Sequence, residues 1–89
     1  MPPDTRVNML VHIRGRFCPE TFVRWIKRHA AKLGVTSTIA SQSGDMIKLT
    51  ASGPEILVDA LALACTLGPG TAVVDDVKTV LIEANESTG

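Results

Sequence analysis

The stretch VNMLVHIRGRFCPETFVRWIKRHAAKLG, residues 7–34, decides the fold, because its hydrophobic period changes partway along. Before Gly15, apolar and polar residues alternate, which predicts a half-buried strand with Val7, Met9, Val11 and Ile13 facing the core. From Phe22 to Leu33 the apolar residues instead recur at helical spacing, which predicts an amphipathic helix. Gly34 follows at the position of a C-cap glycine.

A hairpin and a final strand are predicted farther along the chain. Residues 35–41 and 46–52 are β-branched or alternating runs, and the turn between them contains Gly44. Residues 72–84 form the last predicted strand, which we expect to be broken early by the pair Asp75-Asp76. The tail after this strand carries no pattern that predicts an element.

A second helix is predicted between the hairpin and the final strand. Ser52 is its expected N-cap, with Pro54 early and Glu55 at the capping-box position. The helix should run to about Leu67, where the Gly-Pro-Gly run at 68–70 stops it.

The element order is therefore βαββαβ. This order is typical of the α+β, ferredoxin-like α/β sandwich, with a four-stranded antiparallel sheet and two helices on one face. With 89 residues and no linker or repeat, we expect a single domain over 1–89 with a structured core of about 6–84.

The composition excludes several classes of protein. Lys and Arg together number nine, as do Asp and Glu, so net charge gives no reason to expect binding to nucleic acid or an acidic membrane. No segment resembles a signal peptide or spans a bilayer. Cys18 and Cys65 are too few for a disulfide scaffold and lack the spacing of metal ligands. We expect a cytoplasmic protein without metal or cofactor.

Several motifs together resemble the acylphosphatase family. VHIRGR, VRWIKRHAAKLGV, LTASGPEILVDAL and GPGTAVVDDV stand in the family's order and cover nearly the whole chain. The matching positions are mostly structural glycines, caps and core residues: Gly15, Arg16, Phe22, Ala30, Leu33, Gly34, Gly53, Pro54, Glu55, Gly68, Pro69, Asp75 and Val77. The resemblance implies hydrolysis of carboxyl-phosphate anhydrides at a loop whose amides bind phosphate.

The residues that carry this chemistry in the family are not found at the matching positions. The arginine that clamps the phosphate corresponds to Val23, and the asparagine that holds water corresponds to Ser41. Pro19 has no N–H to donate, and Glu20 adds a negative charge. The equivalent of the phosphate loop is Gly15, Arg16, Phe17, Cys18, Pro19, Glu20, Thr21 and Phe22. Because losing one preorganised donor costs roughly 10²–10³ in rate, the resemblance implies a domain that has lost hydrolysis.

Two alternatives would retain hydrolytic chemistry. Arg24 could replace the missing arginine and leave a weak or altered acylphosphatase, although it lies one residue farther along the helix. Alternatively, Cys18 and Arg24 form the C-x5-R spacing of thiol phosphatases, although Glu20 should raise the pKa of the thiol. A third hypothesis, without chemistry, places Glu20 over the amides that a phosphate would occupy, so that the loop is closed to anions.

Without hydrolysis, the domain would act as a binding module. From Ile56 to Leu67 the strongly polar residues are only Asp59 and Thr66, so helix 54–67 should expose apolar area and could form a homo-oligomer. RNA binding is disfavoured because the predicted strands carry no aromatic residue on which bases could stack. Small-anion binding is doubtful for the reasons above.

Overall fold

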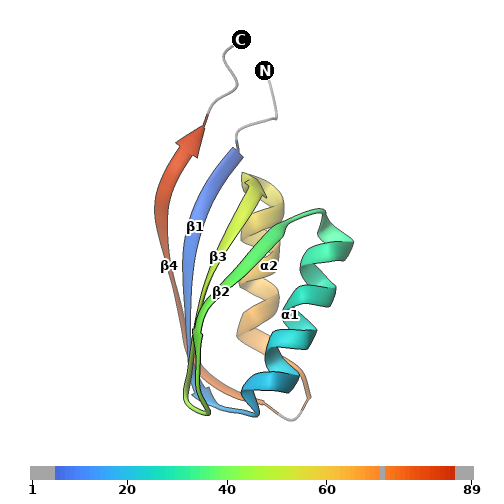
Figure 1. The fold of residues 1–89 in the computed structure, drawn as a ribbon, viewed down its shortest axis with the longest axis vertical. Coiled ribbons are helices and arrows are strands. Elements are labelled where there is room, and N and C mark those ends of the chain that lie inside the picture. Colours follow the sequence, from blue (N-terminus) through green and yellow to red (C-terminus); the bar gives the residue numbers. More distant parts are fainter. Residues whose placement is uncertain (1–5, 71, 86–89) are drawn as a thin grey trace.

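The computed structural model describes residues 6–70 and 72–85. Its elements are β1 (Arg6–Arg16), α1 (Pro19–Leu33), β2 (Thr36–Gln42), β3 (Met46–Pro54), α2 (Glu55–Leu67) and β4 (Val73–Asn85). The strands form one antiparallel sheet in the order β2-β3-β1-β4, and both helices lie on the same side of it (Figure 1). The predicted βαββαβ order and ferredoxin-like sandwich are therefore confirmed.

The hydrophobic core lies between the sheet and the two helices. All four residues predicted to face the core from β1 are buried. The other large, fully buried side chains come from β3 and from both helices: Ile47, Leu49, Phe22, Ile26, Val58, Leu61 and Cys65. Burying one such aliphatic or aromatic side chain stabilises the fold by about 1.5–3 kcal/mol. The central strands β1 and β3 carry most of the buried strand residues, so they contribute more to stability than the edge strands β2 and β4.

The first helix begins earlier than its hydrophobic period indicates. α1 starts at Pro19, with Pro19 and Glu20 in its first turn, rather than at Phe22. Proline is favoured at the first helical position, and an acid there complements the helix dipole. At the other end, Gly34 adopts the left-handed conformation with φ 76°, as predicted for a C-cap glycine.

Ser52 does not cap the second helix, contrary to the prediction. It lies within β3 opposite Asn8 of β1, and its hydroxyl donates a hydrogen bond to the Asn8 side chain. Pairing with β1 carries β3 as far as Pro54, so Pro54 takes the N-cap position and α2 begins at Glu55. Tertiary pairing has overridden a local capping signal.

The last strand is continuous, so the predicted break at Asp75-Asp76 is wrong. Arg14 pairs with Asp76 and Gly15 with Val74, which leaves Asp75 as the extra residue of a β-bulge. The bulge brings the two backbones together, because a Cβ added to Gly15 would lie 2.0 Å from the Val73 carbonyl oxygen. Only glycine fits β1 at this point.

The second helix exposes apolar residues, as predicted. Ile56, Leu63 and Leu67 are 77, 69 and 80% exposed. Further exposed aliphatic side chains lie on β4, at Val73, Val80, Leu81 and Ile82. Within the described residues, no helix has the length and apolar character that crossing a membrane requires.

Candidate functional site

The expected phosphate loop is largely absorbed into neighbouring elements. Of residues 15–22, the first two end β1 and the last four form the first turn of α1. Only Phe17 and Cys18 remain as a link between strand and helix. The segment is therefore a tight strand-to-helix junction.

Two amides of this segment are already used within the protein. The Gly15 amide donates to the Asp45 carbonyl at 3.1 Å, and the Phe17 amide donates to the Gly44 carbonyl at 3.0 Å. These bonds tie the junction to the turn between β2 and β3. Because Pro19 has no N–H, few donors remain in this segment for a bound anion.

Cys18 is the N-cap residue of α1 and is exposed. Its side chain makes no cap hydrogen bond within ordinary limits, but nearby donors favour its thiolate. The Thr21 hydroxyl, the Thr21 amide and the Glu20 amide lower the pKa of Cys18, and they outweigh the opposing charge of Glu20. Glu20 therefore acts to raise the pKa of this thiol, as expected, but the neighbouring donors lower it by more.

The Glu20 carboxylate makes no hydrogen bond to the described amides of the helix start, which the third hypothesis required. It is exposed, and no hydrogen bond or ion pair joins it to another described residue. The donors of the first turn act instead on the sulfur of Cys18.

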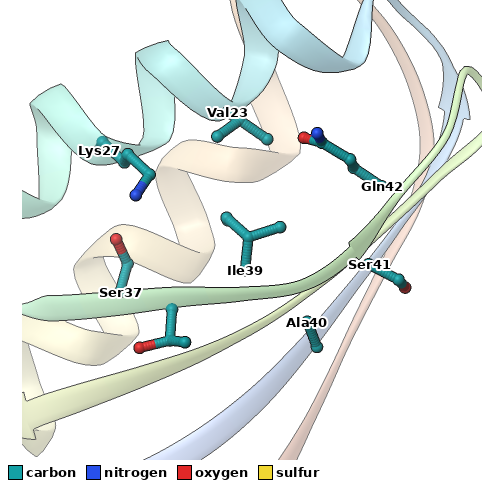
Figure 2. A pocket seen from close by; sticks show the side chains of 8 residues that line it. Val23, Lys27, Ser37, Ile39, Ala40, Ser41 and Gln42 are labelled. Atoms are coloured by element: carbon teal, nitrogen blue, oxygen red, sulfur yellow. The ribbon is translucent and has the colours of Figure 1, made fainter.

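An open hollow of about 620 Å³ lies between α1 and β2. Val23 and Lys27 line it from the helix, and residues 37–42 line it from the strand (Figure 2). Val23 and Ser41, which the motif resemblance aligns with the family's arginine and asparagine, therefore both line the same hollow. Neither supplies a charge there.

Gln42, and not Ser41, extends from β2 toward the helix. Figure 2 shows the Gln42 side chain pointing toward Val23, and the Ala40 and Ser41 side chains pointing away. The cause is a register shift at Ala40, after which Ser41 pairs with Lys48. Sequence reasoning missed Gln42 because the position of a bulge carries no clear signal in the residues.

Lys27 is the second residue of the hollow that sequence reasoning missed. Its side chain points from α1 toward Ser37 (Figure 2). Among the described residues that line the hollow, Lys27 alone carries a charge. The sequence spacing could have indicated Lys27, because it follows Val23 by one helical turn and so lies on the same face of α1.

Arg24 lies on a different side of α1 from Val23. It lines a second, smaller hollow together with Thr21, Trp25, Arg28 and Pro69. Trp25 of this hollow begins an edge-to-face ladder that leads into the core, in which buried Phe22 packs against Phe17 and Trp25 with ring centroids 5.0 and 5.6 Å apart. Arg24 is thus absent from the hollow that Val23 and Ser41 line.

The hollow between α1 and β2 offers binding groups and no evident catalyst. It combines an ammonium, an amide and hydroxyl groups with the apolar side chains of Val23 and Ile39. Its lining includes no acid, histidine or cysteine that could act as a base or nucleophile. Among the described residues, no group of three or more His, Cys, Asp and Glu side chains is arranged to hold a metal ion.

Comparison with known proteins places the chain in a family. No protein-family model matches it. It is 33% identical to an acylphosphatase of Caldivirga maquilingensis over 81 residues, which are 90% of this chain and 85% of the relative. It is 28% identical to an acylphosphatase of Rhodospirillum rubrum over 82 residues, which are 92% of this chain and 90% of the relative.

A solved structure agrees with these sequence relatives. An acylphosphatase from Coxiella burnetii superimposes with a TM-score of 0.81 at 20% identity, over 94% of this chain and 88% of that one. The similarity extends across the sheet and both helices, so the order of elements and their arrangement agree. This chain belongs to the acylphosphatase family.

Proposed function

We propose that this domain does not hydrolyse acyl phosphates and that it acts as a binding module. The observation that carries the proposal is Val23, which faces the hollow from the position of the family's arginine. A phosphoryl transition state spreads negative charge over its oxygens, and a guanidinium fork stabilises it with two parallel hydrogen bonds. An isopropyl side chain offers neither charge nor donor.

Lys27 is a poor substitute for that arginine. It lies four residues beyond Val23, about 6 Å farther along the helix axis and away from the junction with β1. Its ammonium points toward Ser37, and a lysine presents a point charge where a bidentate fork is needed. The position of Lys27 beside β2 favours a role in binding rather than in catalysis.

The other two parts of the family's machinery are also weakened. Ser41 occupies the asparagine position but points to the opposite side of the sheet. The junction has lost donors to Pro19 and to bonds with the turn at Gly44 and Asp45. With clamp, water holder and amides all affected, we expect no measurable rate above the uncatalysed reaction.

The alternative, a weak acylphosphatase that uses Arg24, has less support. Arg24 shares its hollow with Trp25 and Pro69, on a different side of α1 from Val23 and Ser41. The thiol alternative has one supporting feature, the lowered pKa of Cys18. The arginine that the thiol alternative requires, Arg24, lines the hollow beside Pro69.

The proposal is tested by assaying hydrolysis of benzoyl phosphate. We expect the natural protein to match the buffer blank, and the triple variant Val23→Arg, Ser41→Asn, Pro19→Gly to gain turnover. Turnover by the natural protein contradicts the proposal whatever the variant does. If that turnover disappears in Arg24→Ala and persists in Cys18→Ser, the Arg24 alternative is correct, and if Cys18→Ser abolishes it, the thiol alternative is.

Binding of phosphate is a second, independent readout. In an amide NMR titration of the natural protein with inorganic phosphate, we expect no saturable shift among residues 15–22. The triple variant serves as the matched control, because it restores the guanidinium and one amide. Saturable shifts in the natural protein would mean that the junction still binds anions.

A further inference from the structure

The hollow between α1 and β2 runs along the backbone edge of the strand. Six consecutive residues of β2, from Ser37 to Gln42, line it. Successive side chains of a strand point to opposite faces, so a hollow on one face would be lined by alternate residues only. A continuous lining means that the backbone edge of β2, with its N–H and C=O groups, borders the hollow.

This edge carries none of the charged or proline residues that usually protect an exposed strand. β2 is the outermost strand beside β3, and no described strand pairs with its outer edge. Its sequence, TSTIASQ, has no charge and no proline. Exposed edges normally carry lysine, proline or inward charges that prevent pairing with another chain. The single bulge at Ala40 leaves the stretch Thr36–Ile39 regular and open to pairing.

The helix beside the edge supplies two different contacts. Val23 and Ile39 point toward each other across the hollow and offer it apolar surface. Lys27 points toward Ser37, two residues before Ile39 on the same face of β2. Because strand residues two apart lie on one face, a paired strand would present one side chain to Val23 and Ile39, and its neighbour on that face to Lys27.

We propose that the hollow binds an extended peptide segment, which adds to β2 as an antiparallel outer strand. An aliphatic side chain of the segment packs on Val23 and Ile39, and an acidic side chain two residues later in the segment meets Lys27. The backbone of β2 supplies hydrogen bonds, and the two side-chain contacts supply selectivity. This inference names a partner for the proposed binding role and therefore rests on it.

Charge favours an acidic segment. Lys27 is exposed and has no ion pair with a described residue, and no acid lines the hollow. The outward side of α1 adds Arg24, Arg28 and Lys32, which attract an acidic partner at longer range. A segment with lysine at the same position would meet like charge.

The test uses the peptide Ac-SVSISES-NH2, whose Val, Ile and Glu share one face of a strand. Titrated into the isotopically labelled full chain, it should cause saturable NMR shifts in the amides of residues 36–42, Val23 and Lys27, and none in β4. Lys27→Glu should weaken binding about fivefold. Arg28→Glu, the same charge change on the next residue of α1, should leave affinity within about twofold.

The peptide itself provides the control for strand addition. N-methylation of its alternate amides removes backbone donors without touching the protein, and it should abolish the shifts. The inference is overturned if the methylated peptide binds equally, if both charge variants weaken binding alike, or if no saturable shift appears. It is also overturned if the β2 shifts appear on concentrating the protein alone, since a second copy would then be the occupant.

The two proposals fail separately. Peptide binding is measured on the same samples as benzoyl phosphate hydrolysis. Hydrolysis together with peptide binding would overturn only the proposed loss of activity. A silent protein that ignores the peptide would overturn only the peptide inference.

Discussion

The two edges of the sheet differ in how they meet solvent. β2 has seven residues, no charge and one bulge, and of the charged residues of α1 only Lys27 lines the hollow beside it. β4 has thirteen residues and two bulges, and Asp75, Asp76 and Lys78 stand among its exposed aliphatic side chains. Charges and bulges are the means by which sheets avoid pairing with other chains. The β4 edge is thus protected, and the β2 edge beside Val23 and Lys27 is open.

The largest expected effect concerns the point where β1 meets the bulge of β4. A methyl group on Gly15 would lie 2.0 Å from the Val73 carbonyl oxygen. Relieving this clash requires the backbone of β4 to move, which costs free energy. We expect Gly15→Ala to lower the free energy of unfolding by about 3 kcal/mol or more. Chemical denaturation monitored by circular dichroism measures the loss.

Gly44→Ala is the matched control at the other edge. Gly44 lies in the turn between β2 and β3, and an added Cβ would approach the Phe17 carbonyl oxygen no closer than 3.7 Å. We expect a change of less than about 1 kcal/mol. Equal losses in the two variants would mean that the β4 junction is not the tighter of the two.

The two helices carry cysteines in opposite surroundings: Cys18 at the start of α1 is exposed, and Cys65 in α2 is buried. The buried cysteine predicts that the stability of the fold depends on pH. Cys65 of α2 is fully buried, and burial raises the pKa of its thiol from 9.0 to about 12. Above pH 9 the unfolded chain ionises while the folded chain stays neutral, so the stability present below pH 9 falls as pH rises to 12. The loss attributable to this group is at most about 4 kcal/mol.

Denaturation midpoints at pH 8 and pH 11 measure this loss. Cys65→Ala is the control, because it removes the ionisable group at the cost of a small cavity. Other groups titrate in the same range, so the difference between the two proteins is the informative quantity. Parallel pH curves would contradict the assignment.

Adding charge to the open edge should make it resemble β4. Thr38→Glu combined with Ala40→Glu places two carboxylates on exposed positions of β2. We expect the affinity for the acidic peptide Ac-SVSISES-NH2 to fall about tenfold, with unfolding free energy changed by less than about 1 kcal/mol. Thr79→Glu on β4 is the control and should leave the affinity unchanged, whereas equal loss in both would indicate nonspecific charge repulsion.

The smallest expected effect is at the start of α1. Because the pKa of Cys18 is lowered, first of all by the Thr21 hydroxyl, its thiolate should react readily with iodoacetamide near neutral pH. Thr21→Val should slow this reaction about two- to fivefold. Mass spectrometry follows the adduct, and Cys65 should stay unmodified in the folded chain. An unchanged rate in Thr21→Val would exclude a role for the hydroxyl.

Much of the fold could be predicted from the sequence because its elements differ in hydrophobic period. The alternation in β1 and the helical spacing from Phe22 survive into the structure unchanged. The errors lie at element ends. Ser52 has the chemistry of a cap, but pairing with Asn8 keeps it in a strand, and a local signal cannot reveal that pairing.

The candidate site could be predicted only in part. Alignment of motifs placed Val23 and Ser41 at one site, and the structure brings both to the hollow. The direction of the Ser41 side chain depends on the bulge at Ala40, which turns Gln42 toward the helix instead. The open edge of β2 depends on the order of strands in the sheet, which follows from tertiary contacts between distant segments.

The aromatic ladder gives the protein an optical reporter of its own. Trp25, the single tryptophan, packs edge-on against Phe22 and lies 4.1 Å from the His29 ring, between centroids. Its fluorescence therefore senses the first turns of α1 on the side away from Val23. A ligand bound beside β2 should change the Trp25 emission only if it moves α1. The emission spectrum therefore distinguishes a ligand that fills the hollow without moving α1 from one that displaces the helix.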